Sequence, residues 1–374
     1  MEKLLDLKRE LEKDLKQITE HILKPFGDGF KITQPSANDF YYGFWPDDWF
    51  FPTISSDALL SDEDARRLFK FLTENIVDLP VFPDRIEPSG HCVFQPGLED
   101  SPHGRLMPVH LPAAWFRVVK YLYERTGDEA LKKRWLGISQ RSVNQLVFKG
   151  GLPFVSDTEP QVAFAFFDTV GISGNDLMCS VVLEKGFREA NELFGGQFGK
   201  DCLEKAKSIR ENIFKLKTED GYYTSDTLGC KQFSPWANGL LYGTDYITDK
   251  EKEGIRKYAY AHRDELIKYG MVKHVLGFWN KMNPIWTGGE GIYMNGGYWP
   301  VGTAYALKMF YDEDKQFALE LLQEMVDNMR KTDFPEWTDD KCERFGAKKF
   351  VMSIALPLSA INAILEGKNL IDKF

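Results

Sequence analysis

The sequence predicts an all-α fold built from helical hairpins, and three observations favour it. Apolar residues recur at helical spacing in roughly eleven or twelve segments. No run of strand-forming residues is longer than residues 221–225. Short turns alternate along the chain with long loops that are rich in glycine and aromatic residues. Because no linker rich in proline, serine or glycine divides the chain, we expect a single domain spanning residues 1–374.

Helical periodicity and capping residues justify the individual helices. The first helix places Leu4, Leu7 and Leu11 on one face. Ser61 is a favourable N-cap for the second, and Gly127 ends one helix immediately before the next begins. The segments expected to be helical are 2–24, 61–77, 112–126, 128–147, 175–194, 199–216, 235–246, 249–268, 300–311, 314–331 and 350–366.

The loops between the hairpins carry the most distinctive residues. Residues 34–52, interpreted as a loop, hold eight aromatic residues and three carboxylates. Residues 79–111 form a second long loop, and loops of that length inside a compact domain are usually functional. Residues 294–300 combine two glycines with Tyr298 and Trp299 ahead of a helix. A ring of hairpins would gather the long loops, and therefore the functional site, at one end.

The composition narrows the class of ligand. Aromatic residues make up 14% of the 374 residues, and carbohydrate sites use flat aromatic faces with polar tips heavily. The net charge is −9 and no basic tract is present, which argues against a nucleic-acid partner. An acidic surface suits a protein whose ligand is neutral or polyhydroxylated.

Cysteine usage and hydropathy indicate the compartment. The five cysteines are scattered and form no CxxC pair, so neither a metal site nor a disulfide framework is expected. The N-terminal segment resembles a charged amphipathic helix rather than a signal peptide, and no apolar run reaches transmembrane length. We therefore expect a cytoplasmic protein with no membrane partner.

Four short segments occur in a distinctive order along nearly the whole chain. They are 44–52 (FWPDDWFFP), 166–169 (FFDT) with 174–178 (GNDLM), 295–300 (NGGYWP), and 334–338 (FPEWT) ahead of the helix around 353–355. Together they resemble motifs of the six-hairpin glycosidase superfamily, nearest the glucosidase domain of glycogen-debranching enzymes, with trehalase, neutral-invertase and processing-glucosidase relatives behind it. The resemblance implies an (α/α)6 toroid, or six-hairpin barrel, whose long loops form the active-site face.

The resemblance also implies roles for individual residues. The first segment is similar to the family's W-G-R-D and places its sugar-gripping aspartate at Asp48, although Asp47 stands where the family has arginine. The second is similar to W-M-D-A followed by V-E-I-N-A-L, which implies Asp168 as the general acid and Asp176 as a residue that binds or orients sugar. The third is similar to H-N-G-x-x-W-P. The fourth is similar to S-E-x-x-D and implies Glu336 as the general base.

Glycoside hydrolysis explains why two carboxyl groups are needed. One protonates the leaving oxygen; the other activates water in inverting enzymes, at a separation of about 6.5–9.5 Å, or attacks directly in retaining enzymes at about 5–5.5 Å. The phenylalanines beside Asp168 would desolvate it and raise its pKa, as suits an acid. Glu336 precedes Asp339 and Asp340, so the sequence leaves open which carboxylate is the most basic, and Glu290 is an alternative base.

The leading hypothesis is an inverting, exo-acting glycoside hydrolase that acts on an oligosaccharide or small glycoside without a cofactor or metal. A phosphorylase, an epimerase using His91, His110 and His274, and a catalytically silent sugar-binding protein are the alternatives. The sequence leaves the sugar, its anomer, its linkage and the oligomeric state open. The residues expected to bind substrate are Trp45, Asp48, Trp49, His110, Asp176, Trp236, Glu290, Asn295, Tyr298 and Trp299.

Overall fold

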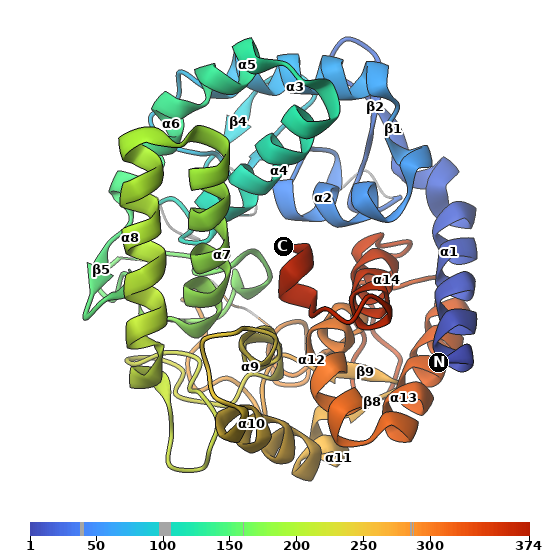
Figure 1. Cartoon of the computed structure of the whole chain (residues 1–374). Coiled ribbons are helices and arrows are strands. Elements are labelled where there is room, and N and C mark those ends of the chain that lie inside the picture. The colour runs from blue at the N-terminus through green and yellow to red at the C-terminus, as the bar shows by residue number, and fades with distance from the viewer. Residues whose placement is uncertain (38–40, 97–105, 160, 285, 287) are drawn as a thin grey trace.

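Six inner helices close into a ring in the computed structural model, which describes residues 1–37, 41–96, 106–159, 161–284, 286 and 288–374 (Figure 1). Each inner helix contacts the next, and the last contacts the first, so the ring is complete. The chain therefore folds as the expected all-α (α/α)6 toroid. The inner helices are α2 (Pro46–Ser55), α4 (Leu111–Thr126), α7 (Leu177–Phe194), α9 (Pro235–Tyr242), α12 (Pro300–Glu313) and α14 (Met352–Leu365).

Outer helices surround this ring and complete the six hairpins (Figure 1). Their sequences carry one apolar stripe, as in α1, where the buried residues Leu4, Leu7 and Leu11 follow helical spacing. The inner helices are more deeply buried than the outer ones; all eight residues of α9, for example, are buried. The outer helices are α1 (Glu2–Ile22), α3 (Asp62–Ile76), α5 (Glu129–Arg134) with α6 (Leu136–Gln145), α8 (Gly196–Asn212), α10 (Asp249–Ala261) with α11 (Arg263–Leu266), and α13 (Lys315–Lys331).

Short antiparallel strands and single 3-10 turns lie within the connections. The strand pairs are β1–β2, β3–β4, β5–β6–β7 and β8–β9–β10. The bounds are β1 (Leu23–Phe26), β2 (Phe30–Thr33), β3 (Arg85–Ile86), β4 (Cys92–Val93), β5 (Phe148–Lys149), β6 (Leu152–Val155), β7 (Gly174–Asn175), β8 (Ile267–Lys268), β9 (Met271–Lys273) and β10 (Tyr298–Trp299), with 3-10 turns at Asp57–Leu59, Ala165–Phe167, Ile213–Leu216 and Leu370–Lys373.

Two local expectations were wrong. Residues 46–55 form the inner helix α2 rather than a loop; every residue from Pro46 to Thr53 is buried, so no polar face reveals the helical period. The helix expected at 128–147 is broken at Trp135, whose buried indole N–H donates to the Thr73 hydroxyl (2.8 Å). The expectation that strands stay short is confirmed, since the longest strands in the described residues, β1, β2 and β6, have four residues each.

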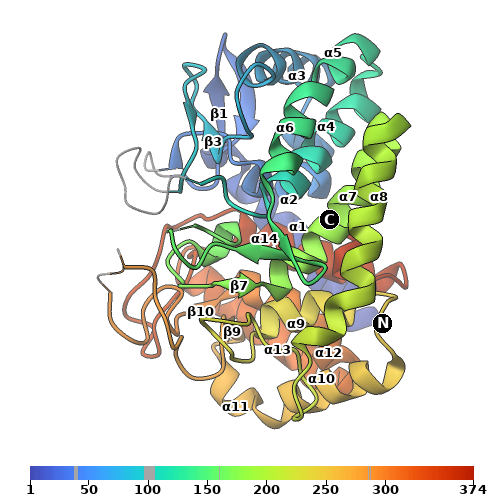
Figure 2. The ribbon, with the colours of Figure 1, turned by 90° about the vertical axis from the view of Figure 1, so that its left-hand side faces the viewer.

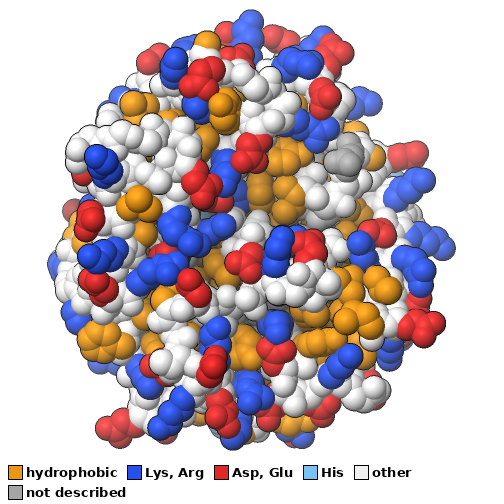
Figure 3. Space-filling view, in the orientation of Figure 1, with side chains coloured by type: hydrophobic (Ala, Val, Ile, Leu, Met, Phe, Trp, Pro, Cys, Tyr) orange, Lys and Arg blue, Asp and Glu red, His pale blue; other side chains and the backbone are white. Residues whose placement is uncertain are grey.

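The two ends of the ring differ as the loop lengths predict. Figure 2 shows β3, β7 and β10 on the left, with the long connections, whereas α7 and α8 and their short turn lie on the right. Figure 3 shows the short-turn end, whose surface mixes acidic and basic side chains. All the segments that resemble glycosidase motifs lie in or next to the long connections.

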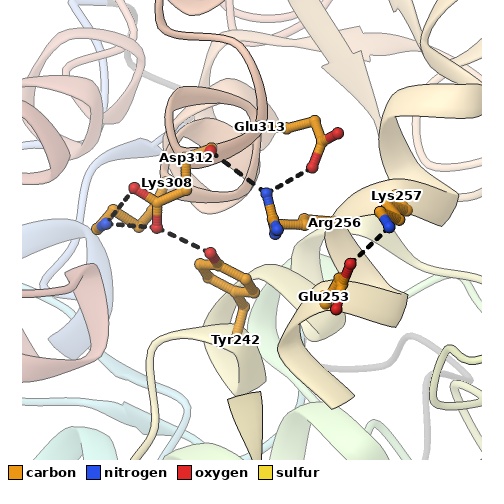
Figure 4. A network of polar contacts seen from close by, with 7 residues as sticks. All are labelled: Tyr242, Glu253, Arg256, Lys257, Lys308, Asp312 and Glu313. Atoms are coloured by element: carbon orange, nitrogen blue, oxygen red, sulfur yellow. Dashed lines mark hydrogen bonds and ion pairs between the residues drawn. The ribbon is translucent and has the colours of Figure 1, made fainter. Parts of the chain in front are cut away.

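Hydrogen bonds and ion pairs between side chains connect α9, α10 and α12 at the short-turn end (Figure 4). Asp312 near the end of α12 accepts hydrogen bonds from Tyr242 of α9 (2.8 Å) and from Lys308. Arg256 of α10 donates to Glu313 (2.6 Å). The network therefore ties two inner helices to one outer helix at the end of the ring opposite the long loops.

Membrane-spanning helices and disulfides are both missing from the described residues. No helix there is long and apolar enough to cross a bilayer. None of the five cysteines, all within the described ranges, is in a disulfide.

Candidate active site

Two carboxyl groups that are far apart in sequence interact at the long-loop end. Asp168 follows the 3-10 turn Ala165–Phe167, and Glu336 lies in the connection between α13 and α14. Burial, followed by the charge of Glu336, raises the pKa of Asp168 to about 8. Burial also raises the pKa of Glu336, to about 7. At neutral pH the arrangement therefore favours a protonated Asp168 beside a Glu336 that ionises more readily.

Glu336 is held by one donor on each oxygen. The Tyr41 hydroxyl donates to Oε1 (3.0 Å), and the Ala347 backbone N–H donates to Oε2 (3.2 Å). The Glu336 N–H in turn donates to the Ala347 carbonyl (2.8 Å). Gly346 is required beside this pair, because a Cβ there would approach Oε2 of Glu336 to 2.6 Å. These contacts fix the carboxylate in one orientation.

Asp168 is positioned by its backbone, through a second loop. The Asn283 N–H donates to the Thr169 carbonyl (2.8 Å), and the Asn283 side-chain amide approaches the Asp168 carbonyl (3.4 Å). The Gly171 N–H donates to the Lys281 carbonyl (2.9 Å). The loop that carries the acid therefore forms antiparallel backbone hydrogen bonds with residues 281–283.

The consecutive residues Asp47 and Asp48 in the first turn of α2 have opposite environments. Asp47 accepts hydrogen bonds from Arg117 and from His110 (3.1 Å). Burial alone would raise its pKa, but these two partners outweigh burial and hold the pKa below its usual value. Asp48 is also buried; burial and the charges of Asp47 and Glu336 hold its pKa well above the usual value.

A fourth carboxyl group, Asp84, belongs to the same cluster. It precedes β3, is 4% exposed, and interacts electrostatically with both Asp48 and Asp168. The Trp45 side chain donates a hydrogen bond to it, and the Arg85 guanidinium lies 3.8 Å away. Burial raises the pKa of Asp84 to about 6, the lowest of the raised values at the site that have a number.

Trp45 presents a partly exposed indole between these groups. The Arg85 guanidinium carbon lies 5.4 Å from the centre of its ring, and the Tyr41 ring meets it edge-on at 5.7 Å. Among the described tryptophans predicted to bind sugar, Trp45 is the one whose side chain is not fully covered. Part of Trp45 is therefore open to solvent at the site.

Tyr293 adds a second phenol close to the carboxyl cluster. Its backbone has φ +49°, the left-handed region that non-glycine residues seldom adopt. Its ring packs against Trp286 (centroids 6.1 Å apart) and Trp299 (5.2 Å). Burial, together with the charges of Asp168 and Glu336, raises its pKa well above the usual value. Tyr293 is therefore a neutral hydrogen-bond donor beside the two carboxyl groups.

Several residues predicted to bind sugar instead lie in the core. Trp49, Trp236 and Trp299 are each at most 1% exposed. His110 is 1% exposed and, besides its bond to Asp47, its Nδ1 lies 3.2 Å from the Ala163 carbonyl oxygen. These four side chains position the helices and loops of the site from beneath.

The remaining predicted residues also have defined places. Asp176 is fully buried and caps α7 by accepting from the Cys179 N–H (2.6 Å); burial raises its pKa to about 7. Asn295 accepts from the Trp279 N–H (2.9 Å), and Tyr298 is 3% exposed within β10. Glu290 is exposed to solvent. The charged groups that raise the pKa of Asp168 are Glu336 and Asp84, and Glu290 is not among them. The electrostatics of the site therefore favour Glu336 over Glu290 as the base.

The histidines required by the alternative epimerase do not form a cluster. His110 is tied to Asp47, whereas His274 stacks on Trp236 with ring centroids 3.6 Å apart. Neither ring nitrogen of His274 has a hydrogen-bond partner in the described part of the chain, and burial lowers its pKa well below the usual value. His91 is exposed in the loop that contains β4.

Sequence reasoning missed Tyr41, Asp84 and Tyr293. Tyr41 lies three residues before the first motif and Tyr293 two residues before the third, so proximity to a motif was the available signal. Asp84 lies in a long connection without periodicity, and nothing local distinguishes it from a solvated charge. No group of three or more side chains that could together hold a metal ion occurs among the described residues.

Comparisons with known proteins support the fold. No protein-family model matches the chain, and no functionally curated protein sequence matches it. A GH63 mannosylglycerate hydrolase from Thermus thermophilus, solved with glucose, superposes with a TM-score of 0.61 at 14% identity, over 93% of this chain and 99% of that one. A wild-type glycosidase gives 0.62 at 13% identity, over 98% of each chain. A rhamnosidase from Klebsiella oxytoca with rhamnose bound gives 0.63 at 12% identity, over 97% of this chain and 64% of that one.

Proposed function

We propose that the protein is a glycoside hydrolase of the six-hairpin type that cleaves the terminal unit of a neutral glycoside with inversion. Asp168 is the general acid, and Glu336 is the general base that activates water. Solved glycosidases that share the fold across nearly the whole chain support this proposal. The observation that carries it is the interaction of Asp168 with Glu336, whose raised pKa values of about 8 and 7 suit the two roles.

The neighbouring side chains would complete the reaction. Protonated Asp168 donates its proton to the glycosidic oxygen as the bond to the anomeric carbon breaks. Glu336, oriented by Tyr41, removes a proton from the water that attacks the opposite face. The carboxylates of the cluster that ionise most readily, Glu336 and Asp84, stabilise the positive charge that develops on the sugar, because the site is desolvated and electrostatic interactions are strong there.

Sugar binding is assigned to three side chains of the cluster. Trp45 would stack on the ring, Asp48 would hold its hydroxyl groups, and Tyr293 would donate a hydrogen bond to it. The neighbours from Thermus and Klebsiella are described with glucose and rhamnose bound, respectively. We infer that a neutral hexose occupies the corresponding place here.

The test is the release of reducing sugar from a panel of glycosides, with and without phosphate. The wild-type protein should cleave at least one glycoside, while Asp168→Asn and Glu336→Gln should each lose roughly 10²–10⁴-fold in kcat, the usual contribution of general acid–base groups. Activity near wild type in both variants would refute the assignment, and strict dependence on phosphate would indicate a phosphorylase.

Inversion is tested separately by following the anomer of the released sugar by ¹H NMR. An inverting enzyme releases the anomer opposite to that of the substrate before mutarotation mixes the two. First appearance of the same anomer would assign the second carboxylate to nucleophilic attack instead.

A further inference from the structure

Two adjoining hollows on the rim of the ring, beside the acid-bearing loop, are not used by the proposed function. The inner hollow has a volume of about 170 Å³ and the outer hollow about 430 Å³. Residues 156–159 and 161 line both hollows, and these five residues are what we call the ridge between the two hollows. The volume of the outer hollow is within the usual range for small-molecule sites.

The inner hollow adjoins the proposed general acid. Its wall includes Val170 and Asn283. Asn283 donates to the Thr169 carbonyl (2.8 Å) and approaches the Asp168 carbonyl, so this wall is the same pair of loops that positions the acid. Because the acid protonates the leaving oxygen, the remainder of the leaving group extends toward the acid's side of the site. The inner hollow lies beside the loop that carries the acid, and therefore on the acid's side of the site.

The lining of both hollows is rich in hydrogen-bonding groups of both charges. The ridge contributes Ser156, Asp157, Thr158 and Glu159, and Lys281 lies opposite it in the inner hollow. In the outer hollow, the one aromatic ring among the described lining residues is that of Phe154, over which the Lys149 ammonium lies 3.4 Å from the ring centre. This mixture of donors, acceptors and both charges suits a neutral polyhydroxylated chain better than an anion, and the apolar side chains in the walls can pack against the faces of sugar rings.

The ridge is held in place without a ligand. The Gln161 side chain accepts from the Ser156 N–H (2.9 Å) and donates to the Met107 carbonyl (3.0 Å). The Ser156 hydroxyl accepts from the Glu159 N–H (3.0 Å). Behind the ridge, β6 pairs with β7, which leads into the first turn of α7. A groove with fixed walls binds without the entropic cost of ordering them.

We propose that the two hollows form one groove that binds the leaving-group side of an oligosaccharide, with one sugar unit in each hollow. The preferred substrate is then an oligosaccharide with at least two units beyond the scissile bond, rather than a glycoside with a small aglycone. The direction in which the chain runs rests on the proposed function, whereas binding in the groove does not require catalysis.

The first experiment measures kcat/KM for substrates that share one terminal sugar and differ in a leaving group of one, two or three sugar units, with an aryl glycoside as the reference. Each occupied hollow adds hydrogen bonds to the bound chain, so kcat/KM should rise roughly tenfold or more from one unit to three. A kcat/KM that does not change with the length of the leaving group would overturn the proposal.

The second experiment fills the groove. Thr158 is exposed and lines both hollows, so Thr158→Trp should remove most of the rise with chain length, whereas Thr158→Ala should retain it. Leu203→Trp, on the exposed face of α8, controls for the effect of an added surface tryptophan. An unchanged length dependence in a folded Thr158→Trp protein would contradict the groove. If Thr158→Trp does not fold, the dependence of the wild-type kcat/KM on the length of the leaving group decides whether the groove binds sugar units.

Calorimetry separates this inference from the proposed function. Asp168→Asn should bind the longer oligosaccharides more tightly than the shorter ones without cleaving them. If the wild-type protein cleaves no glycoside but shows this length-dependent affinity, the hydrolase proposal fails and the groove stands. If cleavage depends on Asp168 but neither affinity nor kcat/KM depends on chain length, the groove alone fails.

Discussion

Asp47 and Asp48 are consecutive in sequence and nearly equally buried, yet they belong to regions with opposite electrostatics. Asp47 belongs to a paired network with Arg117 and His110, in which the Arg117 guanidinium also packs over the rings of Phe50 and Phe374. Asp48 belongs to a cluster of carboxyl groups that repel one another. The pKa of Asp47 is lowered and that of Asp48 is raised. The difference shows that a buried carboxylate keeps its charged form only where a cation and hydrogen-bond donors accompany it.

The largest effects are expected from neutralising the two catalytic carboxyl groups, which should lower activity and increase stability. Asp168→Asn and Glu336→Gln should abolish most activity yet raise the melting temperature by several degrees at pH 8, because each replaces a desolvated acid by a neutral isostere. A raised folded-state pKa gives a stability contribution that is present at low pH and lost as the pH rises through about 7–8. The stabilisation by these variants should therefore disappear near pH 4, as scanning calorimetry at both pH values would show.

Neutralising a carboxylate in the paired network should instead lower the free energy of unfolding. Asp47→Asn leaves the Arg117 guanidinium buried without its carboxylate, and breaking a buried pair in this way costs roughly 3–5 kcal/mol. Asp48→Asn is the matched control, since it removes a repelled charge one residue away and should leave the free energy of unfolding unchanged or increased. Urea unfolding measures both. If Asp47→Asn and Asp48→Asn lowered the free energy of unfolding equally, the proposed electrostatic difference between the two regions would be wrong.

The pH dependence of the wild-type enzyme should follow the two raised pKa values. The value of kcat/KM should rise as Glu336 ionises near pH 7 and fall as Asp168 loses its proton near pH 8, which gives a narrow bell. A profile that is flat between pH 5 and pH 9 would show that these two groups do not control the rate.

Tyr41→Phe should shift the acidic limb of that profile toward higher pH. The Tyr41 hydroxyl donates to Glu336 and so lowers the pKa of that carboxyl, and the substitution removes the bond while retaining the ring. We expect kcat to fall by roughly 10- to 100-fold, the usual range for one hydrogen bond to a charged group. An acidic limb that stays in place would mean that Tyr41 does not bond to the ionised base.

The smallest effect is expected from Asp84→Asn. The negative charge of Asp84 raises the pKa of Asp168, so its removal should move the alkaline limb toward lower pH and leave the acidic limb in place. The pH profile of kcat/KM measures this shift. Movement of the acidic limb alone would contradict the assignment of Asp168 as the acid.

The sequence predicts most of the fold because the outer helices and their turns carry local signals. Ser61 does cap α3 by accepting from the Asp64 N–H, and the chain leaves α4 at Gly127 in the left-handed conformation. The inner helix α2 was missed because burial on all sides removes the periodicity on which such predictions rest.

At the site, the sequence motifs identified the carboxyl residues better than the aromatic residues. The motifs place Asp168 and Glu336 in neighbouring loops, but aromatic residues look alike in sequence whether they face a sugar or the core. Trp236 and Trp299 proved to be core residues, whereas Trp45 keeps an accessible face. Asp84 is brought to the cluster by the pairing of Ile86 of β3 with Phe44, which lies two residues before α2, and no local pattern encodes that pairing.

The most direct test of the acid–base pair uses a glycosyl fluoride of the preferred sugar, whose leaving group needs no proton. If Asp168 is the acid and Glu336 the base, Asp168→Asn should hydrolyse the fluoride at a rate near that of the wild-type protein, whereas Glu336→Gln should remain inactive. Failure of the fluoride to restore Asp168→Asn, or restoration of both variants alike, would contradict the account.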